Sequence, residues 1–428
     1  MRMRRAALLL WLCWSPSASA SALSDAVASC AIGTWCEFTT NNIANTLKCP
    51  GSTCGGVLNI IPYADGLYYS PSQRRAYFLG SDDPGDGPRF VYYDEDSNTW
   101  VLVPETGQHW AGTGVAHQYD GLALSEANGE LYDMHANTGA WWKMSLATGV
   151  WTALPNAGFN NFDDANSMLH HPLLNRTYFL NSGGYRVFNH ANGQFSGLNP
   201  PAGCAVSLHE IGEWNPVLNV GLIAGGNLGT DRNVCKIDAA GTLTELADPP
   251  VALDVVRRET TYDPVSGVFL VFDGPTETFW TFDIQSDVWT QQSGSNAPPA
   301  NFWLARDSFD KLNAIAAPIA PLGAIMFVAC QSYDGLGGGQ HPDGPCRTYV
   351  YRHASGGPSL DGGAANDGGP TDAGASGPTD GGPGTSDGGT NAEPSPSCGC
   401  STTDALGCAF ALCCLLFRRK STSTCALR

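Results

Sequence analysis

The side chains with the clearest chemical potential recur at one position of a repeated pattern. Each unit of the pattern begins with a strand followed by a short turn, and the third residue of the segment where they join falls at positions 71, 126, 172, 216, 264 and 311. About six residues before that turn, most units carry polar or charged side chains. These are Asp65, Asp120, Asn166, His209, Glu210, Arg258, Glu259 and Arg306. Carboxylates and arginines that converge in a concavity suit a hydroxylated or anionic ligand such as a glycan.

Two interpretations of this set are open. If it surrounds a channel mouth, Arg258 and Arg306 face Asp65, Asp120 and Glu210 across the opening and form a ligand-binding site. Alternatively, the same charges satisfy one another across a water-filled funnel and have a structural role only.

The sequence contains no recognisable catalytic motif. It has no Gly-x-Ser-x-Gly, no His-Glu-x-x-His and no glycine-rich phosphate loop. We therefore predict a binding or adhesion module without a cofactor, whose ligand is an extracellular glycan or protein. An extracellular carbohydrate-active enzyme (a lyase, a hydrolase or a copper oxidase) and a structural envelope protein are the alternatives. In the enzyme alternative, His209, Glu210 and Glu259 act together with the arginines.

One segment imitates a calcium loop. Asp94, Asp96, Asn98 and Glu105 have the spacing of ligands in an EF-hand. However, Thr99 replaces the glycine that such a loop requires, and the flanking residues are typical of strands rather than helices. We predict no metal site here.

The elements that must position these side chains are short strands at a regular spacing. In each unit a strand and a turn precede a second, apolar strand, and a third strand then returns through a hairpin on an aromatic residue. The hairpin has one six-residue spacing in four units: Asp94 to Trp100, Ser145 to Trp151, Asn189 to Phe195 and Asp283 to Trp289. This period predicts an all-β fold of six four-stranded antiparallel blades over residues 57–353.

The glycines that close the second strands, such as Gly80 and Gly274, and the Asp-to-Trp hairpins are similar to those of the kelch and galactose-oxidase type of β-propeller. That resemblance implies a ring whose innermost strands line a central channel. It also implies a copper site built from Tyr and His with a Tyr–Cys crosslink, and those ligands do not map onto this sequence residue by residue.

Closure of the ring can be predicted as well. The last unit has strands near residues 302–309, 324–331 and 347–352, and no fourth strand follows them. Residues 57–62 precede the first unit and resemble the outer strand at residues 150–155. We expect residues 57–62 to complete the last blade, because each unit buries its faces only against its neighbours.

The two ends of the chain have the features of an exported protein. Residues 1–22 combine arginines, a short apolar run and small residues, which is typical of a secretory signal peptide. Residues 23–56 form a Cys-rich N-terminal segment. Residues 354–397 are rich in Gly, Asp and Pro and predict a disordered acidic linker.

Residues 398–428 begin with Cys398, Gly399 and Cys400, continue with an apolar run and include a basic cluster at residues 418–420. This order resembles the MYXO-CTERM sorting signal of myxobacterial surface proteins. It implies processing by an envelope protease and anchoring at the cell surface or outer membrane. A plain single-span anchor is the alternative, although the apolar run is short for a crossing of about 20 residues.

The cysteines fit an oxidising compartment. The part between the two ends contains an even number of them: Cys30, Cys36, Cys49, Cys54, Cys204, Cys235, Cys330 and Cys346. We predict disulfides between Cys204 and Cys235 and between Cys330 and Cys346, and a small disulfide knot among the four N-terminal cysteines. Zinc at the closely spaced Cys49 and Cys54 is the competing interpretation.

The net charge of the chain limits its partners. The formal charge is −18 at pH 7, whereas binding to nucleic acid requires a clustered basic surface. We therefore expect no nucleic-acid partner, and we expect the protein to be a monomer.

Overall fold

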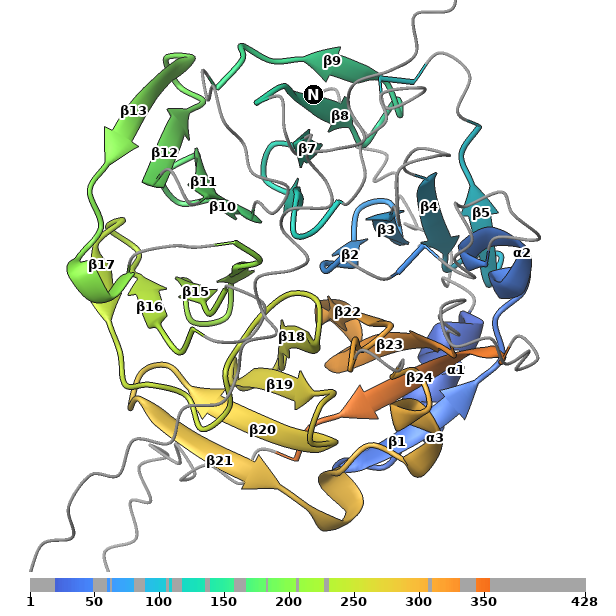
Figure 1. The fold of residues 1–428 in the computed structure, drawn as a ribbon. Coiled ribbons are helices and arrows are strands. Elements are labelled where there is room, and N and C mark those ends of the chain that lie inside the picture. The colour runs from blue at the N-terminus through green and yellow to red at the C-terminus, as the bar shows by residue number, and fades with distance from the viewer. Residues whose placement is uncertain are drawn as a thin grey trace, which may run out of the picture. The chain divides into compact units, whose positions relative to one another are not determined.

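The computed structural model describes residues 20–48, 60–61, 64–80, 89–104, 108–109, 118–134, 139–157, 167–181, 184–204, 208–226, 231–306, 310–331 and 344–354. Over these residues the strands form six four-stranded antiparallel sheets arranged as blades around a ring (Figure 1). The all-β fold and the count of six blades are confirmed.

Five blades take their strands from consecutive stretches of the chain, from the inside of the ring outward. Blade one contains β2 (Tyr68–Ser70), β3 (Arg75–Gly80), β4 (Arg89–Asp94) and β5 (Thr99–Leu102). Blade two contains β6 (Leu122–Ser125), β7 (Glu130–Met134), β8 (Trp141–Ser145) and β9 (Trp151–Ala153). Blade three contains β10 (Ser167–His171), β11 (Arg176–Asn181), β12 (Gly184–Asn189) and β13 (Gln194–Leu198).

Blade four contains β14 (Ile211–Asn215), β15 (Val220–Ala224), β16 (Val234–Ile237) and β17 (Leu243–Glu245). Blade five contains β18 (Arg258–Tyr262), β19 (Phe269–Asp273), β20 (Thr278–Asp283) and β21 (Val288–Gln292). Blade six contains β22 (Ala314–Ile319), β23 (Ala324–Cys330) and β24 (Cys346–Arg352), and its outer strand is β1 (Thr34–Phe38) from the other end of the chain.

Local sequence explains these elements. Strands β15, β19 and β23 are buried along their whole length, and their unbroken apolar runs suit strands that are covered on both faces. Several turns between strands carry Asn or Asp with a positive φ, as at Asn98 (52°), Asn219 (53°) and Asp287 (59°). Short polar side chains of this kind tolerate the left-handed conformation that these turns require.

An N-terminal strand closes the ring, as expected, but it is not residues 57–62. Strand β1 pairs with β24 in register from Thr34 opposite Arg352 to Phe38 opposite Thr348. Of the predicted strand, Ile60 and Ile61 are described, and both are buried in the core beside blade one. The edge of β24 is already occupied by β1, whose Trp35 packs on blade six. The propeller therefore includes part of the segment that we expected to be a separate Cys-rich unit.

The first strand of the last unit was also placed wrongly. Residues 300–303 form the short helix α3 (Ala300–Trp303), and the inner strand of blade six is β22, which begins at Ala314. Phe302 is fully buried in the core between blades five and six. Its apolar character therefore reflects packing of a connecting segment rather than a strand.

Two N-terminal helices cover the junction of blades one and six. Helix α1 (Ala22–Ser29) and helix α2 (Ile43–Leu47) contribute Leu23, Val27 and Leu47 to the core there. None of the helices in the described part of the chain has the length and apolar character needed to cross a membrane.

The described cysteines are all paired in disulfides. The predicted pairs Cys204–Cys235 and Cys330–Cys346 are confirmed, and Cys30 pairs with Cys36 across the start of β1. Cys49, Cys54 and the tail motif Cys398–Gly399–Cys400 lie outside the described residues.

Candidate functional site in the central channel

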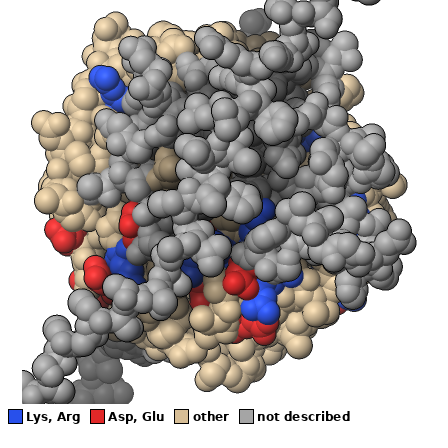
Figure 2. Space-filling model, viewed as in Figure 1, with Lys and Arg blue, Asp and Glu red and all other residues tan. Residues whose placement is uncertain are grey.

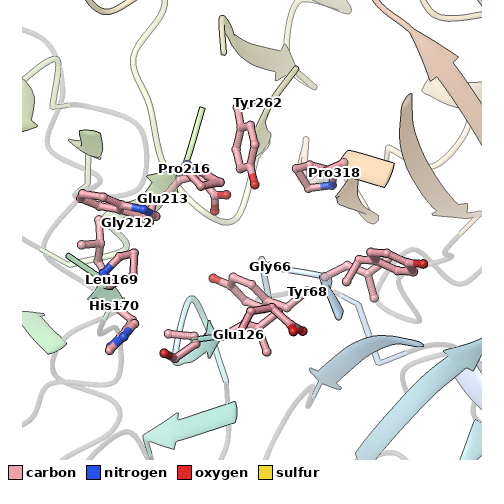
Figure 3. A pocket seen from close by; sticks show the side chains of 18 of the residues that line it. Gly66, Tyr68, Glu126, Leu169, His170, Gly212, Glu213, Pro216, Tyr262 and Pro318 are labelled. Atoms are coloured by element: carbon pink, nitrogen blue, oxygen red, sulfur yellow. The ribbon is translucent and has the colours of Figure 1, made fainter. Parts of the chain in front are cut away.

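A cavity of about 340 Å³ lies among the innermost strands of the blades (Figure 3). Strands β2, β6, β10, β14, β18 and β22 all contribute to its wall. Exposed residues of the turns that follow these strands, such as Pro71, Glu126, Pro216 and Ala320, also line it. The cavity therefore opens where the inner strands end, and we call it the central cavity.

Several polar side chains line this space, among them Tyr68, Glu126, His170, Glu213, Thr260 and Tyr262. Figure 3 shows Tyr68, Glu213 and Tyr262 pointing toward the middle of the central cavity. Burial, followed by the charge of Asp120, raises the pKa of the Tyr68 hydroxyl. Burial, followed by the charge of Glu213, raises the pKa of the Tyr262 hydroxyl. Both phenols therefore keep their protons and can donate hydrogen bonds to a ligand.

Three carboxyls lie next to the deep end of the cavity: Asp65, Asp120 and Glu259. Asp65 and Glu259 directly precede Gly66 and Thr260, which line the wall, and Asp120 accepts a hydrogen bond from the backbone of Gly212, which lines it too. Together with Glu213 they interact electrostatically with one another. We call these four residues the channel carboxyl cluster.

Contacts between blades hold this cluster in place. Asp120 Oδ2 accepts hydrogen bonds from Ser167 Oγ at 2.6 Å and from the backbone N–H of Gly212 at 2.7 Å. Asp120 and Ser167 also form a parallel bridge between blades two and three. A side chain at Gly212 has no room, because a Cβ there would lie 2.4 Å from Ser167 Oγ. Glycine at this position thus leaves room for the Asp120 carboxyl of blade two to accept hydrogen bonds from blades three and four.

Burial controls the ionisation of the cluster. It raises the pKa of Asp65 to about 7 and that of Asp120 and Glu259 well above the usual range. Burial, followed by the charge of Asp65, does the same to the pKa of Glu213. A hydrogen bond joins Asp65 and Glu259. The cluster therefore carries shared protons near neutral pH instead of four full negative charges.

The two predicted arginines do not face these carboxyls. Arg258 is 7% exposed, and its guanidinium lies 2.5 Å from Asp254 Oδ2 and 2.6 Å from Asp273 Oδ1. Glu259, the next residue, interacts electrostatically with Asp65, Glu213 and Asp120 instead.

Arg306 is likewise bound to protein groups outside the channel carboxyl cluster. It donates to the backbone carbonyls of Gly274 and Pro275 and forms ion pairs with Glu277 and Asp310. In the face shown in Figure 2, acidic and basic side chains lie next to each other on the lower half.

His209 and Glu210 do not line the central cavity. His209 is buried and its ring packs edge-on against Tyr119 at 4.9 Å. Glu210 is fully buried, and burial raises its pKa well above the usual range. Asn166 lies outside the described residues. Of the predicted site, the structure thus brings together Asp65, Asp120 and Glu259.

Sequence reasoning missed the residues that line the cavity. Tyr68 and Glu213 each lie three residues after an aligned polar position, Asp65 and Glu210 respectively. A polar side chain three residues further along the same inner strand therefore marks the cavity wall in these two blades. The aligned polar positions lie near the start of each inner strand, whereas the cavity opens at the other end.

The donors present do not fit a copper site with a Tyr–Cys crosslink. No cluster of three or more His, Cys, Asp or Glu side chains that could hold a metal ion occurs among the described residues. The cysteines of that part of the chain are all in disulfides, so none is available for a crosslink to tyrosine.

Comparisons with known proteins reveal distant similarity of fold. No protein-family model matches the chain, and no curated protein matches its sequence. One similar solved structure is described as a novel fungal alcohol oxidase with catalytic diversity among the AA5 family, in complex with copper. It is 10% identical with a TM-score of 0.43, over 68% of this chain and 74% of that chain. A second is described as a nidogen/laminin complex and is 9% identical with a TM-score of 0.39, over 54% of this chain and 80% of that chain. The fold is established by the strand pairing of this chain, and neither similarity bears on its function.

Proposed function

We propose that this protein is a cell-surface binding module that holds part of a glycan in the central cavity. The observation that carries the proposal is the cavity itself, which opens to solvent between exposed turns and presents three convergent polar side chains. Its volume of about 340 Å³ lies in the range of about 300–1,000 Å³ that is typical of small-molecule sites.

The lining favours a sugar over other small ligands. Tyr68 and Tyr262 offer hydroxyl donors and aromatic faces, and Glu213 offers an acceptor. Pro318, Leu169 and Trp214 supply apolar surface between them. Sugars combine hydroxyl groups with apolar C–H faces, and aromatic side chains with a polar tip can contact both. An anionic ligand is disfavoured because the described lining contains no Lys or Arg.

The proposed location is supported by chemistry in the body of the chain. Three disulfides in a domain of this kind fit an oxidising, extracytoplasmic compartment. Export through residues 1–22 and anchoring through residues 398–428 belong to the same proposal and lie almost wholly outside the described residues.

Binding of the full-length protein to an array of immobilised glycans tests the function. We expect at least one class of glycan to be retained, and we expect Tyr262→Phe to weaken that binding because a hydroxyl donor in the cavity is lost. Tyr92→Phe, in β4 and away from the central cavity, is the matched control and should bind as the wild type does. If no glycan binds, or if both variants behave alike, the proposal is wrong.

A further inference from the structure

The central cavity has an unbalanced distribution of charge. The channel carboxyl cluster brings together acids from blades one, two, four and five, and Glu213 reaches the cavity wall. No Lys or Arg is found among the described residues that line the cavity. Arg258, which directly precedes Glu259, is paired with Asp254 and Asp273.

One acceptor of the cluster lacks a partner. Glu259 is 1% exposed, and its Oε1 has no hydrogen-bond partner among the described residues. A buried polar atom without a partner is costly, and a ligand that supplies a donor removes that cost. The cluster thus favours a ligand that donates hydrogen bonds and carries positive charge.

The surroundings of the channel carboxyl cluster favour an organic cation over a metal ion. No group of described acidic or histidine side chains is close enough to hold a metal ion. Glu213 instead lines a space large enough for an organic molecule, with the rings of Tyr68 and Tyr262 beside it, and the other three carboxyls are buried behind it. Aromatic rings attract organic ammonium groups through their negative faces.

We infer that the ligand in the central cavity carries a positively charged amino group, which lies against Glu213 and the channel carboxyl cluster between Tyr68 and Tyr262. This inference rests on the proposed glycan-binding function and names the class of glycan, one that contains hexosamine units with free, unacetylated amino groups. The neutral part of the sugar then packs against the apolar wall near Leu169 and Pro318.

Binding of such a ligand changes the protonation of the site. The titratable groups that interact with Glu213 are Asp65, Tyr68, Asp120, Glu259 and Tyr262. An ammonium group stabilises the ionised form of a nearby carboxyl. The site therefore releases a proton to the buffer when the ligand binds, while the amino group of the ligand keeps its own.

Calorimetry with two matched oligosaccharides tests the inference. Full-length protein is titrated with glucosamine oligomers and with the N-acetylated oligomers of the same length, in two buffers that differ in enthalpy of ionisation. We expect the free-amine oligomer to bind at least tenfold more tightly, with proton release that makes its binding enthalpy depend on the buffer. Glu213→Gln should abolish this preference, whereas Glu245→Gln, an exposed residue of the same blade, should keep it.

Each other outcome overturns the inference in a recognisable way. Equal or tighter binding of the acetylated oligomer shows that the cavity does not select a free amino group. Glycan binding, the proposed function, is then retained and the inference is rejected. An unchanged preference in Glu213→Gln removes the carboxyl from the recognition. Failure of both oligomers, and of every glycan on the array, rejects the inference together with the proposed function.

Discussion

Trp35 of β1 stacks on Tyr351 of β24, with ring centroids 4.6 Å apart and 20° between the ring planes. The two residues are also opposite each other in the strand pairing that joins the two ends of the propeller. Trp35 contacts Phe302 and Phe327 as well, and its indole N–H donates to the carbonyl oxygen of Asn296 at 2.9 Å. One side chain of the N-terminal strand is thus the main anchor of ring closure.

We predict that Trp35→Ala lowers the free energy of unfolding by about 3–5 kcal/mol, the usual cost of removing a large packed aromatic side chain. It should also detach β1 and make the ends of the ring accessible. Urea unfolding gives the energy, and hydrogen exchange of β1 and β24 reports the opening. Trp289→Ala removes another half-buried indole, stacked on Phe282 in blade five. That variant should lose stability without faster exchange in β1, and equal exchange in the two variants would contradict the role of Trp35.

The fold could be predicted from sequence to the extent that it is local. The hairpin from Asp283 to Trp289 and the turn at Pro264 depend on neighbouring residues only, and they gave the blade count. Closure is different, because residues 34–38 and 57–62 are both short stretches with apolar side chains. Which of them pairs with β24 depends on long-range packing, such as that of Trp35 on Tyr351, which a local pattern does not contain.

The disulfides should contribute unequally to stability. Cys204 and Cys235 are 31 residues apart, whereas Cys30 and Cys36 are 6 apart. In the chain-entropy account a longer loop constrains the unfolded chain more, which gives about 4 kcal/mol for the first pair and about 2 kcal/mol for the second. Replacing each pair with serines and measuring urea unfolding tests the order. A larger loss for the Cys30–Cys36 variant would show that this pair acts mainly on the closing strand.

Stability should fall as the pH rises through the range in which Asp65 titrates. The pKa of this carboxyl is raised by burial from 3.8 to about 7 in the folded protein, so the folded chain binds more protons than the unfolded chain between these values. Its effect on stability is therefore most favourable below about pH 4 and becomes less favourable up to about pH 7.

Asp65→Asn removes this dependence, so the difference in unfolding free energy between variant and wild type should grow in favour of the variant from pH 4 to pH 7. Asp248→Asn, at an exposed position, should show a constant difference. A difference for Asp65→Asn that is flat with pH, or that changes in the other direction, would mean that Asp65 is ionised in the folded protein.

The site was harder to predict than the fold for a physical reason. Asp65, Asp120 and Glu259 were found because equivalent positions of the blades meet at the axis. Arg258 occupies an equivalent position too, yet its side chain leaves the channel for Asp254 and Asp273. Position in a repeat determines where a backbone lies, while the direction of each side chain depends on partners that are distant in sequence.

The two arginines provide a final test that separates stability from binding. Arg258→Ala leaves buried Asp273 without its cation and buried Asp254 with only the more distant Arg257, and we expect a loss of about 3–5 kcal/mol in the free energy of unfolding. Arg306→Ala removes more exposed ion pairs to Glu277 and Asp310 and should cost about 1 kcal/mol or less.

Neither Arg258 nor Arg306 lines the central cavity, so the folded fraction of both variants should bind the glycan with the affinity of the wild type. Thermal unfolding and calorimetry of the same samples measure the two effects separately. Weakened binding by folded Arg306→Ala would instead place the ligand near Arg306, in the segment that precedes β22, and away from Tyr68, Glu213 and Tyr262.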